Sequence, residues 1–347
     1  MNDPIAPEKK WKLYHGTREA GDALSRLPDP PRWRPRRAPA PDLDRWWPRE
    51  ARDDAQLPPA TLQRGRNFHA TEHIIEMVNA ALYLRRPLLV TGQPGSGKSS
   101  LVDAVAYELR MGAPLRWNVT SRSTLRDAQY QYDAIGRLQQ KEELPIGEYL
   151  TLGPLGTALL PSTRPRALLI DEIDKSDIDL PNDLLNVFEE GEFEIPELKR
   201  LGEHMSVQVY TADPRQPQVQ VTGGRVACHE FPLMILTSNG EREFPAPFLR
   251  RCLRLQMPNP TGQLPEDDNQ DWKRLDAVVA LHFKDEERAA AVAIIDAFKA
   301  HAAMGRSVAT DQLLNAIYFV MSSQVPPGKA REAVLAELMR ELVAPGA

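Results

Sequence analysis

The sequence predicts an α/β fold, in which a doubly wound parallel sheet carries inserted β-hairpins and is followed by a small all-α domain. Three observations indicate this fold. Short apolar runs alternate with stretches of helical periodicity between about residues 70 and 256. A glycine-rich turn connects the first apolar run to a helical stretch, as in a strand–loop–helix unit. Towards the C-terminus, apolar residues recur at helical spacing alone, which favours a separate helical domain.

The chain begins with an N-terminal segment, residues 1–63, that is rich in proline, arginine and tryptophan. Proline fixes the backbone and removes a hydrogen-bond donor, so we expect an extended arm rather than a helix. Trp33, Trp46 and Trp47 are costly to leave in water. Two interpretations stay open: the arm docks on its own chain or a neighbouring subunit, or it recruits another protein.

Residues 64–258 carry the alternation of strands and helices. A helical stripe precedes the apolar run PLLVTG, and another follows the glycine-rich turn. Further strands are predicted at RWNVTS, ALLIDE and MILTSN, with a helix around Leu184 and Phe188 between the last two. Because helices separate the strands, the sheet is predicted to be parallel. The stripe residues are Ile74, Met77, Val78, Ala81 and Leu82 before the turn, and Leu101, Ala104, Val105 and Leu109 after it.

Two regions complete the organisation. Between Gly191 and Pro232, short alternating runs such as SVQVY and QVQV are separated by proline and glycine, which predicts inserted β-hairpins. The stretch PNPTGQLPEDDNQD, which starts at Pro258, resembles a linker, and helical stripes follow it, so residues 259–347 are predicted to form a helical lid domain.

Composition excludes several classes of protein. The net charge of −5 and the pI of about 5.9 give no general attraction to nucleic acid or to anionic membranes, and only residues 32–37 are strongly basic. No apolar stretch approaches the roughly 20 residues that span a bilayer. Cys228 and Cys252 are the only cysteines, and we expect them to be buried apolar side chains in a reducing compartment. The sequence therefore predicts a cytoplasmic protein that does not bind membranes, and it disfavours nucleic acid as a partner.

The glycine-rich turn matches the pattern G-x-x-x-x-G-K-[ST] between a predicted strand and a predicted helix. Such a loop points backbone N–H groups at phosphates, and the helix N-terminus adds favourable electrostatics. Lys98 is placed to reach the β- and γ-phosphates of ATP, and Ser99 to bind Mg²⁺. The alternative is a glycine-rich turn that matches the pattern by chance. The predicted strand before the turn and the predicted helix after it disfavour this alternative. The predicted nucleotide-binding residues are Gly92, Gln93, Pro94, Gly95, Ser96, Gly97, Lys98, Ser99, Ser100 and Asp171.

Two later strands end in polar residues at the edge where ligands bind in such sheets. Asp171 follows ALLI and is predicted to hold Mg²⁺, and Glu172 is predicted to orient or deprotonate the attacking water. Asn239 ends MILTS and is predicted to position the same water. Alternatively, the two acids only begin a solvated loop, and Asn239 only starts a turn with Gly240.

Arg250 and Arg251 follow the Asn239 strand. Arginine suits a finger that stabilises charge on a transferring phosphoryl group in a neighbouring subunit. The alternative is a pair of surface arginines that solvates a helix.

The combination of GQPGSGKSS, LLIDEIDK, LTSNGERE and FLRRC resembles AAA+ ATPases, and YLTLGPLGTALL is similar to the MoxR branch. The resemblance covers about residues 64–345 and implies ATP hydrolysis in hexameric rings, with Arg251 as the finger and Arg250 beside it. It also implies chaperone-like remodelling alongside von Willebrand factor A domain proteins. The chain departs from the family at the start of a lid helix, where Arg306 does not match a sensor 2 arginine cleanly.

His69, Glu72 and His73 spell H-x-x-E-H, the inverted zinc-protease pattern. The pattern precedes the glycine-rich turn and lacks a second glutamate ligand, so we interpret the histidines as helix-start residues near the nucleotide base.

Three functions stay open. The leading hypothesis is a ring-forming ATPase that remodels a protein partner. The second is a nucleotide-operated switch or scaffold in a signalling or defence module, with slow, partner-gated hydrolysis. A DNA-remodelling protein is the third, for which only the arginine-rich arm offers a basic surface.

Overall fold

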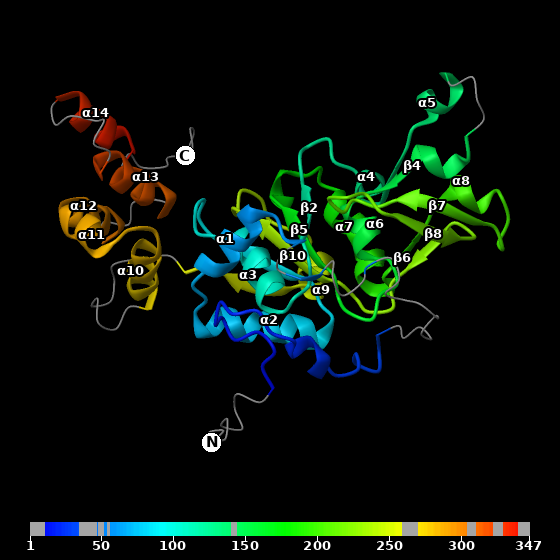
Figure 1. Ribbon diagram of the computed structural model, residues 1–347, viewed down its shortest axis with the longest axis horizontal. Helices are drawn as coiled ribbons and strands as arrows, with labels where there is room; N and C mark the ends of the chain where they lie inside the picture. Colours follow the sequence, from blue (N-terminus) through cyan, green and yellow to red (C-terminus); the bar gives the residue numbers. More distant parts are fainter. Residues whose placement is uncertain are drawn as a thin grey trace.

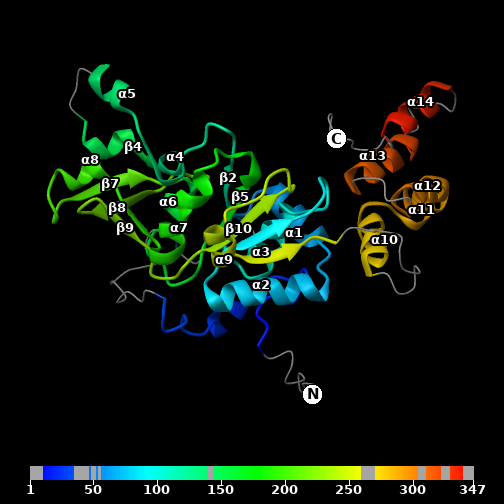
Figure 2. The same ribbon diagram turned by 180° about the vertical axis from the view of Figure 1, so that it is seen from behind.

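The structure is a computed structural model that describes residues 11–34, 47, 52–53, 56–139, 144–258, 270–303, 310–321 and 329–338. Figure 1 shows a central sheet with helices, a second sheet at one end and the C-terminal helices at the other. Figure 2, which views the molecule from behind, shows the same three parts in reverse order.

The central sheet has five parallel strands in the order β11-β1-β10-β5-β2. The register places Leu88 beside Ile235 and Leu253, and Asn118 beside Asp171. Successive strands along the chain are separated by helices, which is the connection that parallel strands require. The predicted α/β fold is therefore confirmed. Its strands are β1 (Leu88–Thr91), β2 (Leu115–Asn118), β5 (Ala167–Asp171), β10 (Leu233–Ser238) and β11 (Leu253–Gln256).

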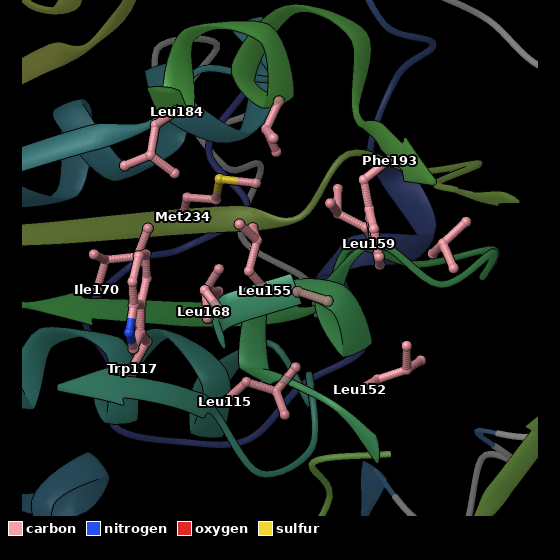
Figure 3. Close-up of a cluster of buried hydrophobic side chains, with 14 of the residues drawn as sticks. Leu115, Trp117, Leu152, Leu155, Leu159, Leu168, Ile170, Leu184, Phe193 and Met234 are labelled. Carbon is pink, nitrogen blue, oxygen red and sulfur yellow. The ribbon is translucent and has the colours of Figure 1, made fainter. Parts of the chain in front are cut away.

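Each face of the central sheet is covered by its own apolar core, because side chains alternate along a strand. Leu88 and Leu169 pack with α2 and α3 on one face. Leu168 and Ile170 pack with α6, α7 and α9 on the other, and Figure 3 shows these two residues beside Trp117 and Met234. The helices are α1 (Pro59–Asn67), α2 (Glu72–Leu84), α3 (Ser100–Glu108), α4 (Leu125–Gln129), α6 (Pro154–Ala158), α7 (Leu180–Glu190) and α9 (Ala246–Arg251).

A second sheet, the inserted sheet, has the strand order β3-β4-β7-β8. The antiparallel pair β7–β8 lies in the predicted hairpin region, as does the separate pair β6–β9. The sequence did not predict β3 and β4, nor the parallel bridge between Thr151 of β4 and Tyr210 of β7. These elements are β3 (Tyr130–Tyr132), α5 (Ala134–Gln139), a 3-10 turn (Ile146–Tyr149), β4 (Leu150–Leu152), β6 (Glu192–Glu194), α8 (Pro196–Lys199), β7 (Ser206–Tyr210), β8 (Gln218–Thr222) and β9 (Arg225–Ala227).

The N-terminal arm, where the structure describes it, docks on its own chain. The backbone N–H groups of Leu13 and Tyr14 donate to Oδ1 of the fully buried Asn79, at 2.6 and 3.1 Å. Trp47 is 3% exposed, and the guanidinium of Arg166 lies 4.5 Å from its ring centroid. Docking on self is thus the interpretation that these residues favour, whereas Trp33, against expectation, is 76% exposed. A 3-10 turn (Ala23–Arg26) also belongs to the arm, and Trp46 lies outside the described residues.

The C-terminal helices build a small core of their own around Trp272, Phe298 and Leu313. They are α10 (Gln270–His282), α11 (Asp285–Ala290), α12 (Val292–Ala303), α13 (Thr310–Met321) and α14 (Lys329–Leu338). Arg306, the residue nearest to a sensor 2 position, lies outside the described residues. Across the described ranges, helices are too short or too polar to cross a bilayer.

Candidate functional site

The glycine-rich loop lies between β1 and α3, as its pattern requires. Gly92, Gly95 and Gly97 have φ values of +152°, +71° and +86°, which side-chain-bearing residues rarely adopt. The loop therefore needs glycine at these positions, because only glycine lets the backbone curl this tightly.

Lys98 is held inside the loop. Its Nζ donates to the carbonyl oxygens of Gly92 at 2.8 Å and Gln93 at 2.9 Å, and the residue is only 7% exposed. Burial lowers the pKa of Lys98, while Asp171 and Asp174 act in the opposite direction. A phosphate bound in the loop would take the place of the two carbonyl oxygens as the partner of the Lys98 ammonium.

Three oxygen-bearing side chains meet at the ends of α3, β5 and β10. Ser99 Oγ donates to Asp171 Oδ1 at 2.8 Å, and Thr237 Oγ1 donates to the same carboxylate oxygen. Thr237 also accepts the backbone N–H of Glu172 at 2.9 Å and is 1% exposed. The sequence analysis missed Thr237, because a threonine inside a strand usually signals only β-propensity.

The predicted water-orienting acid, Glu172, follows Asp171 with a left-handed backbone (φ +59°, ψ +47°). This conformation is uncommon outside glycine and clusters at functional sites. Its carboxylate pairs with Lys175 Nζ at 2.9 Å, and its side chain is 45% exposed. A 3-10 turn (Ile173–Lys175) keeps the two side chains together.

Asn239 lies directly after β10, and a carboxylate fixes its backbone. Asp174 Oδ2 accepts the N–H groups of Asn239 at 2.9 Å and Glu241 at 3.2 Å. Asp174 is 5% exposed, and its other oxygen, Oδ1, is buried without a hydrogen-bond partner in the described part of the chain. Asp174 is a second residue that the sequence analysis missed, although the acid follows Asp171–Glu172 by only two positions.

The structure does not bring the two arginines to these residues. Arg251 Nε donates to Glu189 at 2.6 Å, and its Nη1 donates to the Pro247 carbonyl at 3.1 Å. Arg251 lines a cavity of about 260 Å³ that shares no lining residue with the glycine-rich loop. Arg250 is exposed, and within the described ranges its side chain makes no hydrogen bond or ion pair.

A cavity of about 330 Å³, the loop cavity, lies beside the glycine-rich loop. Three parts of the chain line it: the loop with the start of α3, α1 with its connection to α2, and the C-terminal helices. Its walls include Ser96 and Gly97 of the loop, Phe68 and His69 of the connection, and Arg274 of α10. An apolar wall with a few polar groups is typical of a small-ligand site. The sequence analysis named no residue of α10.

The H-x-x-E-H pattern does not form a joint site. His69 precedes α2 and lines the loop cavity, whereas His73 lies within α2 and lines a different cavity. Burial lowers the pKa of His69, and the neighbouring cations Arg18 and Arg274 lower it further. Among the described residues, no three His, Cys, Asp or Glu side chains gather as metal ligands.

Ser99 and Asp171 fit a Mg²⁺ ion chemically. Both offer oxygen, and Mg²⁺ in phosphate sites is usually held by one or two such protein ligands together with phosphates and waters. The Ser99 and Thr237 hydroxyls donate to Asp171 Oδ1, so the oxygens of Ser99 and Asp171 lie close enough together to be ligands of one ion. The residues present therefore suit the ion.

A match to one protein family agrees with this geometry. Residues 87–251, just under half of the chain, match the family described as AAA domain (dynein-related subfamily). No curated protein shows significant sequence similarity. Among solved structures, NtrX from Brucella abortus, crystallised in complex with ADP, is similar at 16% identity and a TM-score of 0.39. That alignment covers 76% of this chain and 54%, about half, of the NtrX chain. The family match, the parallel sheet and the glycine-rich loop together support an AAA+ ATPase domain.

Proposed function

We propose that the chain binds ATP with Mg²⁺ and hydrolyses it to ADP and phosphate. One observation carries this proposal: hydrogen bonds join Ser99 and Thr237 to Asp171 at the carboxyl edge of a parallel sheet, and Lys98, next to Ser99, bonds to the carbonyls of the glycine-rich loop. Ligands bind at this edge in open α/β sheets. Lys98 would bind the phosphates, and Ser99 and Asp171 would hold the ion, whose charge stabilises the transferring phosphoryl group.

Glu172 and Asn239 act on the attacking water in this proposal. Glu172 must leave Lys175 in order to orient or deprotonate that water, and its partly exposed side chain permits the movement. Asn239 holds the water from the end of β10. Gly92, Gln93, Pro94, Gly95, Ser96, Gly97 and Ser100 bind the nucleotide through the loop backbone.

The separation of Arg251 from the loop supports an oligomer. A finger that lies away from its own loop reaches a phosphate only in a neighbouring chain, so we propose a homo-oligomeric ring with Arg251 acting across the interface and Arg250 beside it. The sequence resemblance to the MoxR branch suggests a cytoplasmic, chaperone-like remodeller with a von Willebrand factor A domain partner. In this proposal residues 1–63 are the arm, 64–258 the nucleotide-binding domain and 259–347 the lid.

A specific observation also favours the switch. The two charged side chains proposed for the chemical step are paired within the chain, Glu172 with Lys175 and Arg251 with Glu189. A molecule at rest with both pairs formed would hydrolyse ATP slowly until a partner or neighbour broke them. The switch therefore predicts nucleotide-dependent assembly with little turnover of the isolated protein.

The test is the mass in solution with and without ATP and Mg²⁺, measured with phosphate release. The variants are Glu172→Gln and Lys98→Ala, with Glu203→Gln as the control because Glu203 is exposed and away from the site. We expect Lys98→Ala to lose nucleotide binding, and Glu172→Gln to bind ATP and accumulate as an ATP-loaded assembly without turnover.

The outcomes separate the two functions. An ATP-dependent ring whose turnover disappears in Glu172→Gln supports the remodelling ATPase. Binding with negligible turnover in the wild type supports the switch. Equal turnover in wild type and Glu172→Gln would contradict the role given to Glu172, and absence of nucleotide binding would overturn both functions.

A further inference from the structure

Arg274 belongs to α10, but its guanidinium bonds to the nucleotide-binding part of the chain. Nε donates to the carbonyl oxygen of His69, and Nη2 donates to that of Ser96, each at 3.1 Å. The residue is only 8% exposed. One side chain of the C-terminal helices thus holds two backbone segments that lie 27 positions apart in the chain (96 − 69).

The contacts of Arg274 extend to both walls of the loop cavity. Its guanidinium carbon lies 5.7 Å from the ring centroid of Phe68, a cation–π distance. At Gly97 an added Cβ would lie 3.4 Å from Arg274 Nη2, so the guanidinium reaches the loop backbone itself. The planar fork suits this task, because it donates to two acceptors in fixed directions while one face stacks on an aromatic ring.

Two buried polar atoms beside this contact lack a hydrogen-bond partner among the described residues. Ser96 Oγ and His69 Nδ1 are buried and have no hydrogen-bond partner within the described ranges. Ser96 and His69 are the two residues whose carbonyls Arg274 holds. The guanidinium therefore fixes the backbone of the residues whose side chains lack partners, which is the arrangement expected around a preformed ligand site.

We propose that Arg274 is the positioning residue that couples α10 to nucleotide at the glycine-rich loop. It fixes the distance between the loop at Ser96 and the Phe68–His69 wall. The phosphates of a nucleoside di- or triphosphate then fit at the loop while its base fits at the wall. Nucleotide and α10 then stabilise each other's placement, since a ligand that needs both walls favours the docked helix. The inference rests on the proposed nucleotide binding and assigns its link to the C-terminal helices.

The experiment measures ADP and ATP affinity by calorimetry, and hydrogen exchange of α10 with and without ADP. The variants are Arg274→Ala and Arg274→Lys, and the control is Lys273→Ala, a neighbouring, exposed cation of the same helix. We expect Arg274→Ala to weaken ADP binding about tenfold or more, as for the loss of hydrogen bonds from a charged group. KM for ATP should rise more than kcat falls.

Hydrogen exchange separates this role from a merely structural one. In the wild type, ADP should slow exchange in α10 and in the glycine-rich loop together. In Arg274→Ala at saturating ADP, the loop should remain protected while α10 exchanges as it does without nucleotide. Lys273→Ala should behave as the wild type.

Arg274→Lys covers the case in which Arg274→Ala fails to fold. Lysine keeps the charge but lacks the two-directional fork, so an intermediate ADP affinity and reduced protection of α10 are expected. Wild-type ADP affinity within twofold in both variants, or full protection of α10 in a folded Arg274→Ala, overturns the inference. If the wild type itself binds neither ADP nor ATP, the proposed function fails first, which distinguishes the two failures.

Discussion

Thr237 is the residue that joins the two acids of the site. One hydroxyl group donates to Asp171 and accepts the backbone N–H of Glu172, whose left-handed conformation it helps to hold. The side chain is buried at the end of β10, where water cannot replace either bond. A substitution at this position therefore tests the geometry of both acids at once.

We expect Thr237→Val to lower kcat for ATP hydrolysis about tenfold. KM should change much less, because the glycine-rich loop and Lys98 remain intact. Loss of the buried acceptor should also lower the free energy of unfolding by about 1–3 kcal/mol. Phosphate release and urea unfolding measure the two effects. Thr222→Val on the exposed edge of β8 is the control. Unchanged kcat would show that the hydroxyl does not organise the acids.

Cys252 illustrates a second effect of burial at the residue scale. Burial raises the pKa of its thiol from an ordinary 9.0 to about 12, and Cys228 is buried as well. Both cysteines are therefore small buried side chains, as the sequence analysis expected. In the folded state the Cys252 thiol stays protonated, whereas in the unfolded chain the same thiol ionises above pH 9. Its contribution to the free energy of unfolding is therefore full below pH 9 and is lost as the pH rises towards 12.

The expected outcome is negligible reaction of either thiol with iodoacetamide at pH 8 in the folded protein, because both side chains are buried and, at Cys252, thiolate is scarce. Two alkylated cysteines should appear in the mass spectrum after unfolding in urea. Rapid alkylation of the native protein would contradict the burial of these side chains.

At the scale of elements, one asparagine makes several of the contacts that dock the arm. Asn79 of α2 is fully buried, accepts from Leu13 and Tyr14, and donates from Nδ2 to the Tyr14 carbonyl at 2.7 Å. The arm adds three buried apolar residues, Leu13, Tyr14 and Leu24, to the face of the central sheet that α2 and α3 cover. Sequence alone could not locate this partner, since an asparagine in a helix usually indicates an exposed position.

We predict that Asn79→Ala releases the arm, because three backbone groups of Leu13 and Tyr14 lose their partner. The free energy of unfolding should fall by about 2 kcal/mol or more. Limited proteolysis should then cut within residues 11–34 faster than in the wild type. Asn186→Ala, on the exposed side of α7, should change neither measurement. Equal cleavage of wild type and Asn79→Ala would contradict the docking contact.

The sequence predicted the elements with strong local patterns and missed those made by distant pairing. Apolar runs ending in Asp171 and Asn239, and the loop around Lys98, indicated the central strands and their functional edge directly. The strands β3 and β4 have three residues each, and β4 meets β7 through the single bridge of Thr151 and Tyr210. Such contacts have no periodicity of their own, because the partner lies far along the chain.

At the scale of the whole molecule, the site residues lie in two places. Lys98, Asp171 and Asn239 lie at one edge of the central sheet, whereas Arg251 lies in a cavity with Trp33 and residues of α7. Among the described residues, Arg64 and Arg274 line the loop cavity, and Arg274 bonds to backbone carbonyls. The proposed ring would bring Arg251 of a neighbouring chain to the loop.

Mixing experiments test this arrangement. Arg251→Ala should bind ATP and hydrolyse it at least about tenfold more slowly, because the finger stabilises transition-state charge. Lys98→Ala should not bind. Mixtures of the two should regain activity above the sum of the separate proteins, since some interfaces combine an intact loop with an intact finger. Phosphate release across mixing ratios measures the gain, and its absence at every ratio would contradict action across an interface.

The bridge between Thr151 and Tyr210 has a mechanical consequence. The chain passes from β4 through α6 into the start of β5, and from the end of β5 through α7 towards β7. The connections before and after β5, the strand of Asp171, therefore both lead to strands of the inserted sheet. The inserted sheet lies on the far side of the central sheet from α10–α14 (Figure 1). A load applied to its outer edge strands would reach the strand of Asp171 from both ends at once.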